Sequence, residues 1–351
     1  MEIIERPFVI AGPCSVESRE QLESVCTSLC SLPQVQMIRG GVWKPRTRPG
    51  GFEGLGEPAL QWMQEISNGP LRMADGNHVR FCCEVARPEH IELCLRHGIN
   101  TVWIGARTTG NPFMVDELAE ALRGNNMQVM VKNPMSPDVR LWIGAFERLQ
   151  QANINCIAAI HRGFNMYNNY DYRNTPLWEL AIELRRTFPT LPILCDPSHI
   201  SGKSSMAKDL MLRALQLAYD GFMVEVHPNP SQAWTDADQQ LTPSQLSDIL
   251  KSLPNNINDD SSHTTALEAL RSRIDAIDYD MLQLLARRME VSREIAAVKR
   301  NEGISVYQAK RWESVMNNRI KIATDMGLDP KFVKELLDKI HIESVRVQME
   351  K

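Results

Sequence analysis

Eight short apolar runs recur along roughly the first two thirds of the chain, with helix-like patterns between them. They are, in order, PFVIAGPCS, VQMIRG, VRFCCEV, TVWIGAR, QVMVKN, CIAAIHR, PILCDPSH and FMVEVH. Their spacing of roughly 30 residues is typical of a βα unit repeated eight times. The sequence therefore predicts an α/β fold, a closed (β/α)8 TIM barrel, whose active site lies at the C-terminal ends of the strands.

Basic residues stand at or just beyond the ends of several of these runs. The whole chain is slightly acidic, with 39 Lys+Arg against 43 Asp+Glu, so this clustering does not follow from a basic composition. Cations gathered at one rim predict a pocket for a multiply charged small molecule, such as a phosphorylated one. The alternative is a solvated rim with surface salt bridges. The six residues are Arg39, Lys44, Arg46, Arg107, Lys132 and Arg162.

Residues of metal-ligand type also follow the strand-like runs. Each alone is more often an ordinary polar residue or buried thiol, but a closed barrel brings all of them to one rim. A mixed set of nitrogen, oxygen and sulfur donors suits one borderline divalent ion such as Mn, Fe, Co or Zn, without choosing among them. The four residues are Cys14, His199, Glu225 and Asp236.

Composition argues against two classes of function. A net charge of -4 and a pI near 6.1 disfavour a general nucleic-acid binder. No apolar run reaches the roughly 20 residues that a membrane helix needs. The start, MEIIERPFVI, lacks the basic residues and extended apolar core of a signal peptide. We therefore predict a cytoplasmic protein that binds neither nucleic acid nor membrane.

The chain changes character after the last run. Residues 253–265, LPNNINDDSSHTT, are polar and predict a linker between a barrel at 1–252 and a second domain at 266–351. Apolar residues then recur at three- and four-residue steps, which predicts a helix to about Glu302 and two more, from about Ser305 to Met326 and from about Asp329 to the end. Three helices with one very long member bury little surface alone, so we expect a homodimer through this all-α domain.

Residues 1 to about 250 resemble a known family. The segments AGPCS, RGGVWKPRT, GART, VKNP, HRG, DPSH and VEVH, then the Asp236 segment, follow the order seen in 3-deoxy-D-arabino-heptulosonate 7-phosphate (DAHP) synthases. The match is closest to the short type I beta form, with no extra regulatory domain before the barrel. It implies condensation of phosphoenolpyruvate with erythrose 4-phosphate and release of phosphate, the first step of the shikimate pathway and of aromatic amino acid biosynthesis.

The resemblance also implies roles for individual residues. Apart from the resemblance, Lys44 is predicted to act as a proton donor, since a lysine crowded by other cations has its pKa lowered, and Glu84 and Asp236 are the remaining acid candidates in the substrate site. A metal would polarise the aldehyde. Contacts to the aldose phosphate would come from Arg46 and Thr47, and contacts to phosphoenolpyruvate from Arg39, Lys44, Arg107, Lys132 and Arg162.

A sister family uses the same enolpyruvate chemistry on arabinose 5-phosphate. These 3-deoxy-D-manno-octulosonate 8-phosphate synthases typically carry an Asn-Arg-Ser type segment after the lysine that follows the second strand. Here Pro45, Arg46 and Thr47 follow Lys44, which favours erythrose 4-phosphate.

The helical region predicts a second anion site. On one helix, Arg271 and Arg288 would be about 25 Å apart, so Arg271 can share a ligand with Arg288 and Lys299 only from an antiparallel partner chain. Ser344 and Gln348 lie four residues apart on the last helix and could line the same pocket. The alternative is a solvated charged face.

The segments LRSRIDAID, LLARRMEVSREIAAVK and ESVRVQ resemble the all-helical (AroQ-type) chorismate mutases over residues 266 to about 348. The resemblance implies that the arginines hold the carboxylates of chorismate, while Lys299 and Gln348 donate to the ether oxygen. Arg311 and Gln308 would also line the site. Gln308 stands where an aspartate is common, and Trp312 follows Arg311 where an acid is usual. Without that acid the hydroxyl of chorismate loses a hydrogen-bond acceptor, which would weaken the rearrangement of chorismate to prephenate.

Two functions follow for the helical domain. The first is a bifunctional enzyme, in which chorismate or prephenate bound at the mutase site also gives allosteric feedback on the barrel. The second makes the helices a dimerising ligand sensor with weak mutase activity. A third hypothesis is a barrel that catalyses some other carbon–carbon chemistry and carries a helical tail for oligomerisation. This hypothesis does not explain why Arg271, Arg288, Lys299 and Gln348 occur together.

Overall fold

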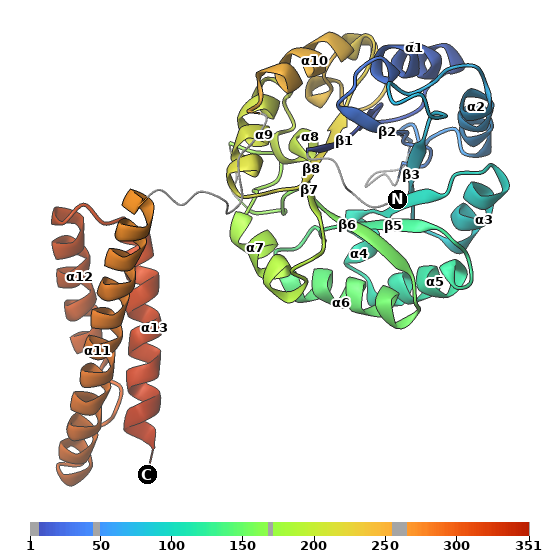
Figure 1. Cartoon of the computed structure of the whole chain (residues 1–351). Helices are drawn as coiled ribbons and strands as arrows, with labels where there is room; N and C mark the ends of the chain where they lie inside the picture. Colours follow the sequence, from blue (N-terminus) through green and yellow to red (C-terminus); the bar gives the residue numbers. More distant parts are fainter. Residues whose placement is uncertain (1–6, 45–49, 168–170, 255–264, 351) are drawn as a thin grey trace. The chain divides into compact units, whose positions relative to one another are not determined.

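The computed structural model describes residues 7–44, 50–167, 171–254 and 265–350 (Figure 1), and at 265–269, 272 and 276 it describes the backbone alone. The chain divides into two compact units, Met1–Asp259 and Asp260–Lys351. Most of the predicted linker, 253–265, lies outside the described residues.

The first unit is a closed barrel of eight parallel strands. Each strand pairs with the next along the chain, and β8 pairs with β1. The predicted (β/α)8 barrel is thus confirmed. The strands are β1 Phe8–Gly12, β2 Val35–Arg39, β3 Phe81–Val85, β4 Thr101–Ile104, β5 Gln128–Lys132, β6 Asn155–His161, β7 Ile193–Cys195 and β8 Gly221–Glu225.

Helices surround the strands, and Figure 1 shows the longer ones as an outer ring. They are α1 Arg19–Cys30, α2 Glu57–Asn68, α3 Pro88–Arg96, α4 Ala106–Thr109, α5 Pro112–Leu122, α6 Val139–Gln151, α7 Trp178–Thr187, α8 Pro197–Ser201, α9 Ala207–Gln216 and α10 Pro243–Ser252. Short 3-10 turns lie at Ser204–Met206, Pro230–Gln232 and Ala237–Gln239.

Side chains alternate between two buried layers, because successive residues of a strand point to opposite faces. One layer, which includes Val9, Ile38 and Val129, packs between the strands and the helices. The other, which includes Met37 and Met130, fills the inside of the barrel. The barrel is therefore a packed core, and its functional residues gather at one end of it.

The second unit consists of three helices: α11 Thr265–Asn301, α12 Ala309–Asp325 and α13 Pro330–Met349. The predicted helical region is confirmed, but α12 begins later than the expected Ser305. The residues before it make other bonds: Ser305 Oγ donates to the Tyr307 carbonyl, and the Val306 carbonyl accepts from Lys299. Helix α13 contacts both α11 and α12.

Much of the apolar surface of α11 is exposed within the described unit. Its exposed apolar residues recur at steps of three, four or seven residues: Leu270, Ile274, Ile277, Met281, Leu284, Val291, Ile295 and Val298. Among the described helices of the whole chain, none is both long and apolar enough to cross a membrane.

Candidate active sites

Two of the predicted basic residues end strands and point into the barrel. The side chains of Arg39 and Lys132 are only 2% and 3% exposed. Arg39 Nη2 lies 3.0 Å from Glu225 Oε1, and Lys132 Nζ donates to Asp196 Oδ2 at 2.8 Å. Arg39 Nε and Nη1 are buried without a hydrogen-bond partner among the described residues. Unpaired buried N–H groups are costly, so these two are donors suited to an anionic ligand.

Further cations lie around this pair. Arg162, directly after β6, is buried and donates through Nη1 to Asn174 Oδ1 at 2.7 Å. Burial lowers the pKa of Arg162 to about 10, and the positive charges of Arg173 and Arg107 act in the same direction. Arg107 lies on α4, just beyond β4. Arg46 and Thr47 lie outside the described residues.

Glu84, near the end of β3, points to the same interior. Its Oε2 accepts a hydrogen bond from Trp103 Nε1 at 3.1 Å. Trp103 also lies under the Arg39 guanidinium, with 5.0 Å between the guanidinium carbon and the ring centroid. Its ring thereby joins an acid and a cation of the predicted substrate site.

Lys44 contacts the predicted metal ligand Cys14. Its Nζ donates to Cys14 Sγ at 2.9 Å and to the Cys14 carbonyl at 3.0 Å. The expected lowering of the Lys44 pKa is wrong. Burial alone would lower it, but the nearby Cys14 and Glu225 outweigh burial and the Arg39 charge, and the pKa is raised. Lys44 is therefore a cation at neutral pH.

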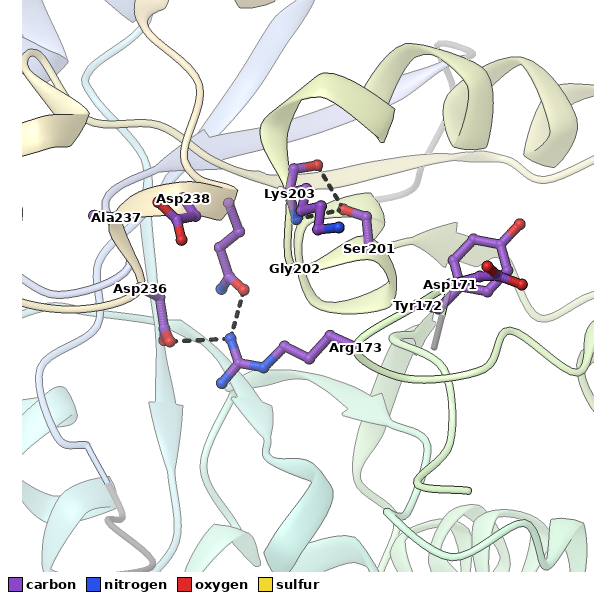
Figure 2. A pocket seen from close by; sticks show the side chains of 10 residues that line it. Asp171, Tyr172, Arg173, Ser201, Gly202, Lys203, Asp236, Ala237 and Asp238 are labelled. Atoms are coloured by element: carbon purple, nitrogen blue, oxygen red, sulfur yellow. Dashed lines mark hydrogen bonds and ion pairs between the residues drawn. The ribbon is translucent and has the colours of Figure 1, made fainter. Parts of the chain in front are cut away.

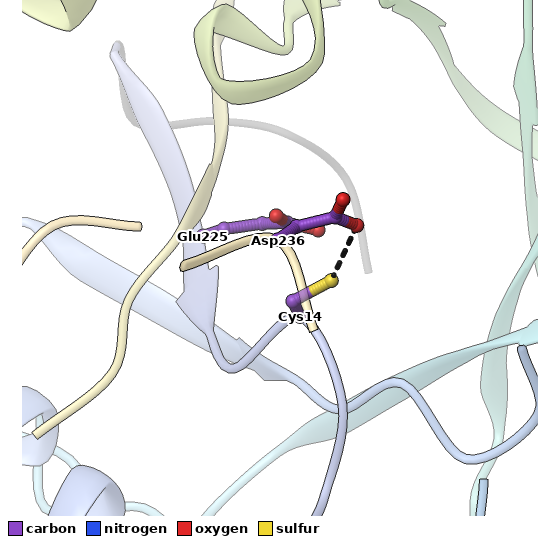
Figure 3. A group of neighbouring side chains, drawn as sticks. All are labelled: Cys14, Glu225 and Asp236. Atoms are coloured by element: carbon purple, nitrogen blue, oxygen red, sulfur yellow. Dashed lines mark hydrogen bonds between the residues drawn. The ribbon is translucent and has the colours of Figure 1, made fainter. Parts of the chain in front are cut away.

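Three of the four predicted metal ligands form a compact group, with donor atoms of Cys14, Glu225 and Asp236 within 4.8 Å of one another (Figure 3). Cys14 Sγ lies 3.2 Å from Asp236 Oδ2. His199 is not part of this group, but its Nε2 lies 3.8 Å from Glu225 Oε1. Glu225 Oε1 is buried and receives no hydrogen bond from the described residues. Its charge is balanced in part by Arg39 Nη2, 3.0 Å away, and a buried carboxylate oxygen beside sulfur and nitrogen donors also fits a divalent metal ion.

Asp196 is a functional candidate that the sequence reasoning missed. Its Oδ2 lies 2.8 Å from His199 Nδ1 and also accepts from Lys132. Burial lowers the pKa of His199, which keeps the imidazole neutral, as a metal ligand must be. A carboxylate at the other ring nitrogen typically orients such a ligand. The signal was present in CDPSH, where Asp196 follows a buried strand and precedes His199.

Local backbone geometry brings the strand ends together. Asp236 has a φ of 48°, in the left-handed region that few residues other than glycine adopt. At Gly41, any Cβ would overlap the Cys14 carbonyl oxygen, so only glycine allows the chain after β2 to pass this close to Cys14. A cavity of about 400 Å³ lies beside Asp236 and is lined by Arg173, Lys203 and Gln239 among others (Figure 2).

In the second unit, four predicted residues form two pairs between α11 and α13. Arg288 Nη1 donates to Ser344 Oγ, and to the Ile340 carbonyl at 3.4 Å. Lys299 Nζ lies 3.3 Å from Gln348 Oε1. Arg271 is exposed near the start of α11, while Gln308 stands at the N-cap position of α12 without a side-chain capping hydrogen bond and Arg311 lies in the first turn.

Trp312 lies on α12 and stacks on His341 of α13, with ring centroids 3.7 Å apart and planes 10° apart. Burial, and then the charge of Arg288, lower the pKa of His341. From the sequence, Trp312 was recognised only as the replacement of an acid, and His341 was not among the predicted site residues. Spacing along one helix gives no signal for a stack between two helices.

Residues 5–259 match the sequence family described as the DAHP synthetase I family. The chain belongs to this family. Residues 270–349 match the family described as chorismate mutase type II. Both resemblances predicted from the sequence are thereby confirmed.

Individual relatives agree with both matches. The phospho-2-dehydro-3-deoxyheptonate aldolase of Thermotoga maritima is 31% identical over 233 residues, 66% of this chain and 64% of that protein. A crystal structure of the Thermotoga maritima aldolase, also called DAHP synthase, gives a TM-score of 0.60 at 28% identity, covering 70% of this chain and 67% of that one. The chain thus spans just under two thirds of the Thermotoga maritima sequence.

The helical part resembles a separate set of proteins. The 4-amino-4-deoxychorismate mutase of Streptomyces pristinaespiralis is 34% identical over 87 residues, 25% of this chain and 67% of that protein. A T-protein of Enterobacter agglomerans is 34% identical over 85 residues, which is 23% of its length.

Proposed function

We propose that the barrel condenses phosphoenolpyruvate with erythrose 4-phosphate and water to give DAHP and phosphate, in the cytoplasm. The observation that carries this proposal is the buried Arg39, with two unpaired N–H groups, beside Lys132 and the Cys14–Glu225–Asp236 group. Phosphoenolpyruvate carries a carboxylate and a phosphate on three carbons, so several fixed cations are needed to hold it.

Cys14, His199, Glu225 and Asp236 would hold one divalent ion, Mn, Fe, Co or Zn. When bound, such an ion supplies Lewis-acid polarisation of an aldehyde oxygen. Arg39, Lys132 and Arg162 orient the enolpyruvate anion. Lys44 holds a proton at Nζ, next to Cys14. Arg46 and Thr47 are proposed to hold the aldose phosphate, and Arg107 and Glu84 complete the substrate site.

We further propose that the helical domain rearranges chorismate to prephenate. Arg288, Lys299, Ser344 and Gln348 supply donors from two packed helices, and a pericyclic reaction needs positioned donors without a nucleophile. The exposed apolar stripe of α11 supports a homodimer, in which Arg271 of the partner would complete each site with Gln308 and Arg311. Chorismate or prephenate bound there would act as the feedback signal.

A ligand sensor is the second candidate for this domain. It is favoured by Trp312, which stacks on His341 where an acid would accept the hydroxyl of chorismate. The rate of chorismate turnover by the full chain separates the two, because a sensor gives little or no prephenate and a mutase gives a clear rate.

Phosphate release tests the barrel proposal. Metal-stripped full-length protein is given phosphoenolpyruvate with erythrose 4-phosphate or arabinose 5-phosphate, with and without Mn. We expect release with erythrose 4-phosphate only, and only when metal is present. Release with arabinose 5-phosphate alone would instead assign the barrel to 3-deoxy-D-manno-octulosonate 8-phosphate synthesis.

A further inference from the structure

Arg173, in the loop between β6 and α7, links two carboxylates of the proposed metal site. Its Nη1 donates to Asp236 Oδ1 at 2.9 Å and to Gln239 Oε1 at 2.5 Å, as Figure 2 shows. Gln239 Nε2 in turn donates to Glu225 Oε2 at 2.5 Å. An unbroken hydrogen-bonded bridge therefore runs from Asp236 through Arg173 and Gln239 to Glu225.

The bridge is anchored to the element that carries His199. Arg173 N donates to the Ser201 carbonyl at 3.2 Å, and Asn174 Nδ2 donates to the His199 carbonyl at 2.6 Å. The stem of Arg173 also packs closely on Gly202, where any added Cβ would lie 2.8 Å from Arg173 Cβ. The loop is thus held against α8 by both backbone and side-chain contacts.

The bridge uses one oxygen of each carboxylate and leaves the other facing the remaining donors. Asp236 Oδ1 accepts from Arg173, while Oδ2 lies 3.2 Å from Cys14 Sγ. Glu225 Oε2 accepts from Gln239, while Oε1 lies 3.0 Å from Arg39 Nη2 and 3.8 Å from His199 Nε2. We propose that Arg173 and Gln239 are positioning residues that fix the two carboxylates so that each presents one oxygen to the metal ion.

This inference rests on the proposed metal site and adds to it two residues that are not ligands. The Arg173–Asp236 ion pair is expected to contribute little to the stability of the fold. The Arg173 side chain is 45% exposed and that of Asp236 is 21% exposed, and ion pairs this open to solvent stabilise a fold by about 1 kcal/mol or less. Loss of Arg173 is therefore expected to act mainly on metal affinity. Loss of a residue that hydrogen-bonds to a metal ligand typically lowers metal affinity 10- to 100-fold.

Cobalt binding tests the proposal directly. Metal-stripped full-length protein is titrated with Co²⁺, and both the dissociation constant and the thiolate-to-cobalt absorption from Cys14 are measured. We expect Arg173→Met and Gln239→Met each to weaken binding roughly 10- to 100-fold and to shift the absorption bands. The double variant should be little worse than either single one, because both belong to one bridge. Arg173→Lys should recover part of the affinity, since it keeps one charged donor.

Arg186→Met serves as the matched control, because Arg186 is an exposed arginine of α7 whose ion pair among the described residues is with Glu183, three residues before it on the same helix. Its affinity and spectrum should equal those of the wild type. The proposal is overturned if both bridge variants bind Co²⁺ as the wild type does, or if the metal-free variants lose thermal stability in proportion to their loss of affinity. Wild-type protein that binds no Co²⁺ would instead overturn the metal site itself.

Discussion

At the scale of single residues, three strands carry a charged residue two positions after an inward-facing methionine. The pairs are Met37 and Arg39, Met130 and Lys132, and Met223 and Glu225. Because alternate residues of a strand share a face, each charge enters the barrel at the end of the apolar layer. The same geometry buries the charges and concentrates them at one site.

Arg39→Lys tests the importance of the guanidinium itself. Lysine keeps the charge opposite Glu225 but cannot make the forked contact that the unpaired Nε and Nη1 offer. We expect the KM for phosphoenolpyruvate to rise roughly 10- to 100-fold, measured by phosphate release at saturating erythrose 4-phosphate. Arg80→Lys, a change at a partly exposed pair with Asp75, should leave this KM unchanged. An unaltered KM in Arg39→Lys would contradict the assignment.

His161 predicts a pH dependence of stability that is separate from catalysis. Its Nδ1 lies 2.7 Å from the Tyr219 hydroxyl, and burial lowers its pKa from the usual 6.5 to about 4. The unfolded chain therefore binds the proton first as the pH falls, and stability is lost between about pH 6.5 and 4. The loss should reach about 3 kcal/mol. Calorimetric unfolding of the barrel across this range should show a smaller loss in His161→Gln, and equal losses would refute the interpretation.

At the scale of elements, helix α11 combines two predicted roles. Its apolar stripe is exposed, with Leu284 64% exposed, and Arg288 lies one turn further along. A charge in the middle of a buried dimer seam costs several kcal/mol. We expect Leu284→Glu to convert the proposed dimer to a monomer in analytical ultracentrifugation and to abolish mutase activity, because in the proposed arrangement each site includes an arginine of the partner. A wild-type monomer that turns over chorismate would disprove this arrangement.

The contact between α11 and α13 gives a second prediction. Lys299 Nζ lies close to Gln348 Oε1, so the two side chains hold each other at the proposed ether-oxygen site. Removing one donor from such a site typically costs 10²- to 10³-fold in kcat. Lys299→Ala should therefore reduce prephenate formation by at least 100-fold, with phosphate release unchanged. Arg287→Ala, an exposed change on the same helix, is the control, and equal losses in both variants would point to unfolding of the helix.

At the scale of the whole molecule, the two compact units predict separable activities. Expressed separately, 1–259 should release phosphate and 260–351 should convert chorismate. Prephenate should inhibit phosphate release by the full chain and not by 1–259, because the proposed effector site lies in the second unit. Equal inhibition of both proteins would place the effector site in the barrel.

The sequence by itself determined the repeated βα pattern, the change to helical periodicity near residue 265 and the residue types at the strand ends. These features depend on local spacing along the chain, because the period of a strand or a helix decides which residues lie on the same face. They were sufficient for the barrel, the helical region and both family resemblances. The roles of individual site residues stay predictions.

Only the tertiary structure decided which distant groups meet. Three contacts join elements that are separate along the chain. They are the contact of Asp196 with Lys132 and His199, the Arg173–Gln239 bridge, and the stack of Trp312 on His341. The raised pKa of Lys44 has the same origin, since its interactions with Cys14 and Glu225 outweigh the effect of burial. Such contacts depend on the closure of the barrel and the packing of helices, and no local periodicity along the chain encodes them.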